Sequence, residues 1–186
     1  MKRGISRREF VKLSATGAIA LAAGGCRRRT RKPPSLAPAA APAAAHRYFP
    51  ALEFATLVAC CGRLLPKDEA PGAVEMGAPE YMDRMFSSAD RPVWHLIVRR
   101  GLGRLAREAK GRFARPFHEA TAAEQDALLG EFQQREGRDR IFFHHLLAAT
   151  LEGAFSHPQH GGNRDGAGWK LMGVSPDPCA PFAPQP

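Results

Sequence analysis

The chain has 186 residues, with 27 Lys and Arg against 18 Asp and Glu, and a formal net charge of +9. This length suits one domain with a tail, and 44% hydrophobic with 24% charged residues excludes a wholly disordered chain and a membrane bundle. The first 32 residues hold ten of the basic residues and one acid, so the remaining 154 carry 17 of each sign. A neutral body argues against a surface that tracks phosphates, and nucleic acid is therefore not an expected partner.

Residues 1–26 have the organisation of an export signal. A basic start precedes an apolar run at 13–25, which is too short to cross a bilayer. Between them, the pair Arg7 and Arg8 is followed by Phe10 and an aliphatic residue, and this arrangement closely resembles the twin-arginine export motif. We expect these residues to direct the chain to the periplasm.

Cys26 follows a run of Ala and Gly that resembles a lipoprotein cleavage box, and we expect it to carry a lipid anchor. The other interpretation is ordinary signal cleavage nearby, with Cys26 removed. Residues 27–48 form a basic and then Pro/Ala-rich linker. The predicted layout is a membrane end, a tether and a folded domain at 49–186.

In the folded part, apolar residues recur at three- and four-residue spacing, and no stretch alternates convincingly with period two, which indicates helices. Prolines and a capping box mark the helix ends. The expected helices are one at 52–65 ended by Pro66, a short one opened by Pro79, a longer one from Pro92, one behind the Thr121–Glu124 capping box, and one capped by Asp139. In the last helix, the residues expected to face inward are Ile141, Phe142, Leu146, Ala149 and Thr150. We expect a small all-α domain of about five helices, with a long Gly/Pro-rich loop over the last thirty residues.

Two histidine pairs are the candidates for a metal. Adjacent residues on a helix point about 100° apart, so His144 and His145 do not suit one ion. His157 and His160 could supply two ligands from a loop, but no carboxylate–histidine pattern of the HExxH type accompanies them. The sequence contains no Cys-x-x-Cys-His and no Gly-x-Gly-x-x-Gly after a strand, which excludes covalent haem attachment and a dinucleotide cradle. We assign no catalytic, cofactor-binding or metal-binding residue to this chain.

Cys60, Cys61 and Cys179 are the disulfide candidates, since export would place them where disulfides persist. Cys60 and Cys61 lie mid-helix in apolar company, which favours core or disulfide residues over nucleophiles. Cys179 lies in a Pro-rich tail and is the best candidate for a bond to another chain, or back to Cys60 or Cys61. In the other interpretation, all three stay reduced.

The segment 157–169 is rich in glycine and ends in a tryptophan. Its glycines would let backbone amides approach a partner closely, and an exposed tryptophan on such a loop would anchor an interface. In the other interpretation, the tryptophan folds back onto the domain and the glycines only make turns. The candidate interface residues are Gly161, Gly162, Asn163, Asp165 and Trp169.

Three blocks in the region 52–175 resemble the small subunit (subunit 3) family of gluconate 2-dehydrogenase and related fructose and glucose dehydrogenases. The twin-arginine segment agrees with that family. Two residues depart from its pattern: His157 stands where an acid is usual, and His160 where an aromatic residue is usual. The blocks are Leu64–Asp68 with Gly72–Ala78 and Tyr81–Asp83; Ile141–Phe143 with Thr150 and Gly153–Phe155; and Pro158, Gly161–Asn163 and Trp169–Gly173.

The resemblance implies a non-catalytic accessory subunit of a membrane-associated dehydrogenase. In that family, a large flavin-bearing subunit of the glucose–methanol–choline type binds FAD, and a multihaem c-type cytochrome commonly joins the complex. The small subunit carries the export signal for the large one. The resemblance therefore implies that this chain supports export, maturation and stability of a flavoprotein partner. The alternative is a stand-alone periplasmic lipoprotein that binds a small ligand or a metal through His157 and His160.

Overall fold

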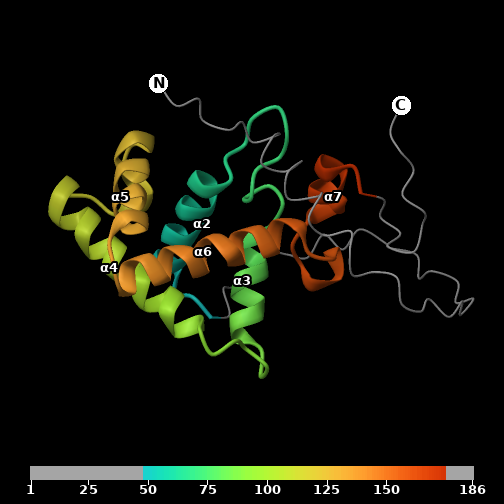
Figure 1. Ribbon diagram of the computed structural model, residues 1–186, viewed down its shortest axis with the longest axis horizontal. Coiled ribbons are helices and arrows are strands. Elements are labelled where there is room, and N and C mark those ends of the chain that lie inside the picture. The colour runs from blue at the N-terminus through green and yellow to red at the C-terminus, as the bar shows by residue number, and fades with distance from the viewer. Residues whose placement is uncertain (1–47, 175–186) are drawn as a thin grey trace, which may run out of the picture. The chain divides into compact units, whose positions relative to one another are not determined.

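The computed structural model describes residues 48–174 of the chain (Figure 1). By its contacts, Ala44–Gly168 is one compact unit, and the second unit comprises the two ends of the chain, of which only 169–174 are described. The predictions for Arg7, Arg8, Phe10, Cys26 and the linker therefore lie outside the described residues, as does Cys179.

Over residues 48–174 the chain forms six α-helices and no strand, which confirms the expected all-α fold class. Three short 3-10 helices connect them: η2 (Phe117–Glu119), η3 (Pro158–His160) and η4 (Arg164–Gly166). None of the described helices is long and apolar enough to cross a membrane. The α-helices are α2 (Ala51–Leu64), α3 (Ala78–Ser87), α4 (His95–Phe113), α5 (Ala122–Gln134), α6 (Arg138–Phe155) and α7 (Ala167–Met172).

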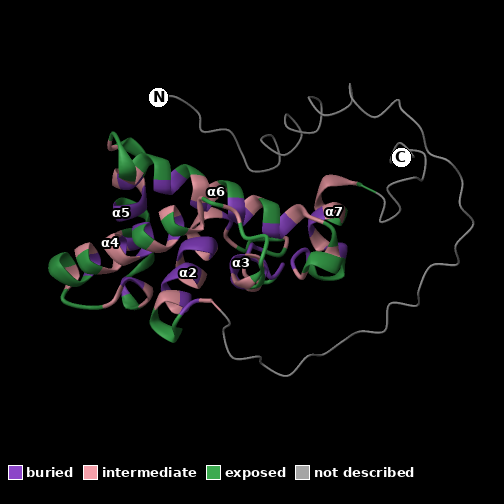
Figure 2. Ribbon diagram, turned by 90° about the horizontal axis from the view of Figure 1, so that it is seen from below, coloured by how far each residue is buried: buried purple, intermediate pink, exposed green. Residues whose placement is uncertain are grey.

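Helix α6 is the element around which the others pack, since it contacts α2, α3, α4 and α5 (Figure 1). Two glycines allow the closest of these contacts. A Cβ on Gly101 of α4 would lie 1.9 Å from the ring of Phe142, and a Cβ on Gly153 of α6 would lie 2.8 Å from the Cα of Ala78. Figure 2 shows buried and exposed bands alternating along α6. The core between these helices consists of fully buried side chains that include Phe86, Phe117, Phe132, Phe142, Leu57, Leu102, Leu105, Leu128, Leu146, Met76 and Met82.

Local signals set several helix ends as predicted. Helix α2 ends two residues before Pro66, and Pro79 lies in the first turn of α3. The capping box of α5 is present: the Thr121 hydroxyl accepts from the backbone N–H of Glu124, whose carboxylate accepts from the backbone N–H of Thr121. These ends depend on groups within four residues of one another, which is why the sequence predicts them.

Three expectations about the second half of the chain were wrong. Asp139 does not cap α6, because the helix begins earlier, behind Gly137 at φ 72°, and Asp139 accepts instead from Arg104 at 2.8 Å. Ile141 does not face inward, since its side chain is 49% exposed. The last thirty residues are not all loop, because α7 lies within them.

Candidate functional site

The segment 157–168 follows α6 and ends in the first turn of α7, and we call it the 157–168 loop. It is held to the C-terminal end of α6 by one buried asparagine. The side-chain Nδ2 of Asn163 donates to the carbonyl of Ser156 at 2.8 Å, and its Oδ1 accepts from the backbone N–H of Gly168 at 2.7 Å. Its backbone N–H donates to the carbonyl of Gly153 at 2.8 Å. Asn163 is fully buried with φ 45°, a left-handed conformation that asparagine tolerates better than most residues. This residue therefore satisfies groups at both ends of the loop.

Two glycines bring the 157–168 loop into backbone contact with α6. A Cβ on Gly162 would lie 2.0 Å from the carbonyl oxygen of Gly153, and a Cβ on Gly168 would lie 2.2 Å from that of Ala154. Any side chain at either position would push the loop off the helix. Close packing within the chain thus explains why both positions are glycine.

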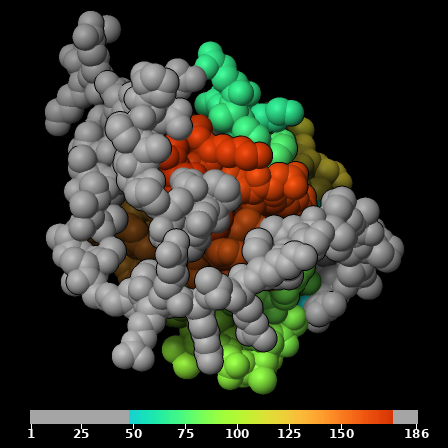
Figure 3. All heavy atoms as spheres, turned by 90° about the vertical axis from the view of Figure 1, so that its right-hand side faces the viewer, coloured from blue at the N-terminus to red at the C-terminus, as the bar shows by residue number. Residues whose placement is uncertain are grey.

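The same loop also contacts the segment before α3. The backbone N–H of Arg164 donates to the carbonyl of Met76 at 3.0 Å, and its guanidinium pairs with Glu80 at 3.1 Å. Gly77, at φ 82°, leaves room for that guanidinium. Figure 3 shows the orange-red loop on the surface beside the green segment that precedes α3. Two blocks that are about 85 residues apart in sequence therefore meet here.

Helix α3 carries two further residues of the same blocks, and both make long-range hydrogen bonds. Asp83 is buried, and its Oδ1 accepts the backbone N–H groups of Tyr48 and Phe49, each at 3.0 Å. The hydroxyl of Tyr81 donates to Glu152 of α6 at 2.6 Å. Burial and this carboxylate raise the pKa of Tyr81 well above its ordinary value. Both side chains thus tie α3 to its neighbours.

The predicted interface residues fall into two groups in the described fold. Gly162 and Asn163 are buried within the chain, and Gly161 is half-buried with its Cα beside the guanidinium of Arg84. Asp165 is exposed at φ 55°, and Trp169 is half-buried. A role for these five in binding a partner stays a prediction. Asp165 is exposed and Gly161 and Trp169 are half-buried, so these three can reach a partner more readily than the buried Gly162 and Asn163.

The two helical cysteines lie in the core with free thiols. Cys61 Sγ is 3.6 Å from the hydroxyl of Thr150 on α6. Burial raises the pKa of Cys61 from its ordinary 9.0 to about 12, and it also raises the pKa of Cys60. Because the thiolate is the nucleophile, neither residue is activated for chemistry.

The histidines that the structure describes are not gathered into a metal centre. The rings of His157 and His160 lie 6.4 Å apart, and each has a nitrogen at 3.2 Å from an amide nitrogen of Gln159. His145 stacks on Trp94 with ring centroids 5.2 Å apart, while His144 is exposed. Across residues 48–174, no three His, Cys, Asp or Glu side chains are grouped to hold an ion.

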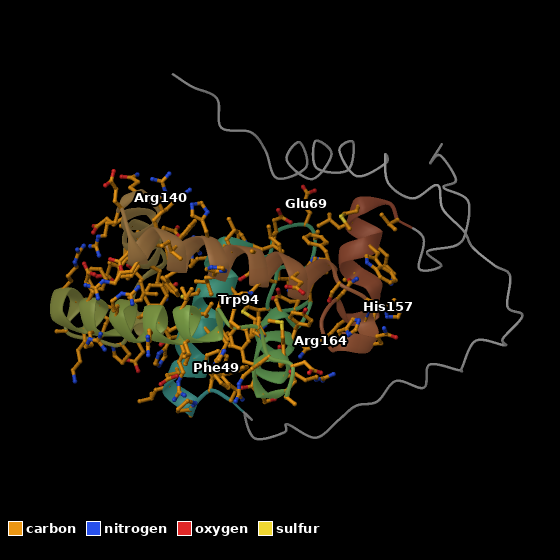
Figure 4. All side chains as sticks on the ribbon, turned by 60° about the horizontal axis from the view of Figure 1, so that its bottom comes forward. Phe49, Glu69, Trp94, Arg140, His157 and Arg164 are labelled. Atoms are coloured by element: carbon orange, nitrogen blue, oxygen red, sulfur yellow. The ribbon has the colours of Figure 1, made fainter. Side chains whose placement is uncertain are left out.

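Sequence reasoning missed an aromatic cluster where α2, α3 and α4 begin or end. Phe86 is its centre, with Trp94, Tyr48 and Phe49 at centroid distances of 5.4, 5.5 and 5.7 Å (Figure 4). The guanidinium of Arg99 lies 5.4 Å above the Tyr48 ring and pairs with Glu53 of α2 at 2.9 Å. The sequence does hold a signal for this cluster, because Phe49, Phe86 and Trp94 each lie within two residues of a helix end.

The fold and site define a small helical protein whose motif residues hold its own loops and helices together. The sequence matches the family described as gluconate 2-dehydrogenase subunit 3 over residues 51–176. The match covers more than half of the chain, and the chain belongs to that family. Membership implies association with a larger dehydrogenase subunit. No curated protein and no solved structure gives a significant match to this chain.

Proposed function

We propose that this chain is the non-catalytic small subunit of a periplasmic, membrane-associated, flavin-dependent dehydrogenase. The observation that carries the proposal is the family match over residues 51–176. In this proposal, the large subunit is of the glucose–methanol–choline type and holds the FAD, and a c-type cytochrome can complete the complex. The chain supports export, maturation and stability of that partner.

Two features support an accessory role over an independent enzyme. The motif residues Asn163, Asp83 and Tyr81 each use their polar atoms in hydrogen bonds within the chain. The thiols of Cys60 and Cys61 are buried, with raised pKa values. In this proposal, the partner therefore carries out the chemistry of the complex, and this chain supplies the export signal and a binding surface.

The first experiment is purification of the tagged native chain from its own membranes, followed by an absorption spectrum of the eluate. We expect a co-purifying larger subunit with flavin absorbance, and a Soret band when a cytochrome is present. A colourless single chain that is stable alone would overturn the proposal. In that case metal analysis would test the stand-alone lipoprotein with ligands at His157 and His160.

The export role is tested by the double substitution Arg7→Lys and Arg8→Lys, which keeps the charge and removes the arginine pair. We expect both this chain and its larger partner to stay in the cytoplasmic fraction. The matched control is Arg27→Lys with Arg28→Lys, a second arginine pair outside the motif, which should leave export unchanged.

The anchor is tested separately with Cys26→Ser. We expect loss of metabolic labelling by a fatty acid and release of the complex from washed membranes. Retained labelling would show that Cys26 is not the acylated residue.

A further inference from the structure

Helix α4 is strongly basic, and half of its cations have no acidic partner. Glu108 is its only acid. Three of its cations are paired with acids of neighbouring helices: Arg99 with Glu53 at 2.9 Å, Arg104 with Asp139 at 2.8 Å, and Arg112 with Glu131 at 2.7 Å. The other three, Arg100, Arg107 and Lys110, form no ion pair within residues 48–174.

The three unpaired cations lie on one side of α4. Leu96, Arg100, Gly103, Arg107 and Lys110 follow one another at spacings of four, three, four and three residues, which places them along one face of the helix. We call these five residues the basic face of α4. Figure 1 shows α4 at the edge of the bundle. The opposite side of the helix is buried in the core and carries Val98, Leu102, Leu105 and Ala109.

The basic face is open among the described residues. A Cβ on Gly103 would meet only the guanidinium of Arg107, at 3.6 Å. A Cβ on Gly111, the neighbour of Lys110, would meet no heavy atom within 4 Å apart from the helix's own backbone. The side chains of Arg100, Arg107 and Lys110 are all exposed. Their charges are therefore available to a partner.

Nearby acids do not cancel this charge. Glu108 follows Arg107 and so points about 100° away from it. It accepts from both Arg135 and Arg112, which lower its pKa and outnumber its charge. The exposed acids of the segments that adjoin α4 each have an exposed arginine within four residues of the sequence: Asp90, Glu119 and Glu136.

The linker ends beside the first turns of α4. The ring of Tyr48, its last residue, lies 5.7 Å from that of His95, and the guanidinium of Arg99 lies 5.4 Å from the centre of the same ring. Between Cys26 and Tyr48 the chain can span at most about 75 Å. A lipid on Cys26 would therefore keep the basic face within reach of the membrane and at a high local concentration there.

Exposed aliphatic residues lie at the same end of α4. Leu96 is 42% exposed, and Val93, two residues before the helix begins, is 92% exposed. The half-buried Trp94 lies between Val93 and the helix. Cations along a helix, with apolar residues beside them, are the composition of surfaces that lie on anionic membranes.

We propose that the basic face of α4 binds anionic phospholipid headgroups and determines which side of the domain faces the membrane. This inference rests on the membrane association in the proposed function, and it adds a second membrane contact to the lipid on Cys26. Arg100, Arg107 and Lys110 pair with lipid phosphates, and Val93 enters the headgroup region beside them. The sides of the domain away from α4 remain for the larger subunit.

The test uses vesicles and the full-length chain with Cys26→Ser, so that no lipid on the chain itself contributes. The protein is floated with vesicles of phosphatidylcholine that contain about 30% phosphatidylglycerol, and with vesicles of phosphatidylcholine alone. We expect binding to the anionic vesicles at low salt, weaker binding at high salt, and little binding to the neutral vesicles.

Two double substitutions locate the contact. We expect Arg100→Glu with Arg107→Glu to lower the apparent affinity for the anionic vesicles by about tenfold or more. Lys67→Glu with Arg84→Glu makes the same change in net charge at exposed residues of the turn after α2 and of α3, and should change the affinity by less than about twofold. The basic residues at 27–32 are present in every variant, so the difference between the pairs reports on α4. Circular dichroism melts check that the helices are intact.

The outcomes separate this inference from the proposed function, because the vesicles replace the partner. Binding that needs the basic face, by a chain that brings down no dehydrogenase subunit, would support the inference and overturn the subunit role. Equal losses for the two pairs, or no binding to anionic vesicles, would overturn the inference while the subunit role stands. Unchanged vesicle binding with Arg100→Glu and Arg107→Glu, but less co-purified larger subunit, would assign the face to an acidic protein surface and overturn it as well.

Discussion

The side-chain oxygen of Asn163 accepts a hydrogen bond of 2.7 Å from the backbone N–H of Gly168, and this bond closes the loop between α6 and α7. The amide nitrogen of the same side chain donates to the last turn of α6 through the carbonyl of Ser156. One buried side chain thus satisfies both a donor and an acceptor of the backbone.

We predict that Asn163→Ala lowers the free energy of unfolding by about 2–4 kcal/mol. The substitution removes the partner of a buried N–H and of a part-buried carbonyl, and puts alanine in the left-handed region. Asp165→Ala is the control, because Asp165 also has a positive φ of 55° but is exposed. It should cost about 1 kcal/mol or less. Urea denaturation of the full chain measures both, and equal losses would contradict the role of the Asn163 side chain.

Two glycine substitutions in α4 should change the free energy of unfolding in opposite directions. Gly101→Ala would place its Cβ 1.9 Å from the buried Phe142 ring, so we expect a loss of about 1–3 kcal/mol or more. Gly111 lies on the same helix, and apart from the helix's own backbone a Cβ there would meet no heavy atom within 4 Å. We therefore expect Gly111→Ala to raise the stability by about 0.5–1 kcal/mol through helix propensity. Thermal melts compare the two variants with the wild type. A loss for Gly111→Ala would show that this face is covered in solution.

The fold class and the helix ends could be predicted because their causes are local. Each of these signals acts on backbone groups within a few residues, as Pro66, Pro79 and the capping box at Thr121 do. The inward side of α6 could not be predicted in the same way, because apolar residues occupy both sides of that helix. Periodicity therefore placed Ile141 inside, whereas the structure leaves it 49% exposed.

The site was harder to predict than the fold. The sequence singled out the 157–168 loop, but burial of Asn163 depends on the carbonyl of Gly153 and the amide of Gly168, which only the folded chain brings together. The same holds for Asp83, whose two donors lie 34 and 35 residues away. Polar side chains of a motif that could bind a partner can thus already be hydrogen-bonded within the chain.

Arg135 connects three helices through one guanidinium, and we predict that Arg135→Ala costs about 1–2 kcal/mol. It donates to Glu108 of α4 at 2.8 Å, Glu131 of α5 at 3.0 Å and Asp139 of α6 at 3.2 Å. Because Arg135 lowers the pKa of Glu108, this contribution is lost as the pH falls through that lowered pKa.

The control for Arg135 is Arg115→Ala, since the single ion pair of Arg115 with Glu124 spans 3.8 Å at an exposed site. It should change stability by less than about 0.5 kcal/mol. Urea denaturation at low and high salt measures both variants, and the Arg135→Ala loss should shrink at high salt. A loss that is independent of both salt and pH would assign the role of Arg135 to its packing on Phe132.

The buried thiol of Cys61 should make the fold sensitive to alkaline pH. Its pKa is raised from 9.0 to about 12 in the folded chain, so above pH 9 the unfolded chain loses a proton that the folded chain keeps. The stability is complete below pH 9 and falls as the pH rises towards 12, by up to about 1.4 kcal/mol per pH unit for this thiol. We expect Cys61→Ala to lower stability at pH 8 through the lost volume, and to flatten the decline between pH 9 and 10.5. Urea denaturation under reducing conditions over this range measures the slope, and an unchanged slope in Cys61→Ala would show that other groups, such as Tyr81, carry the alkaline response.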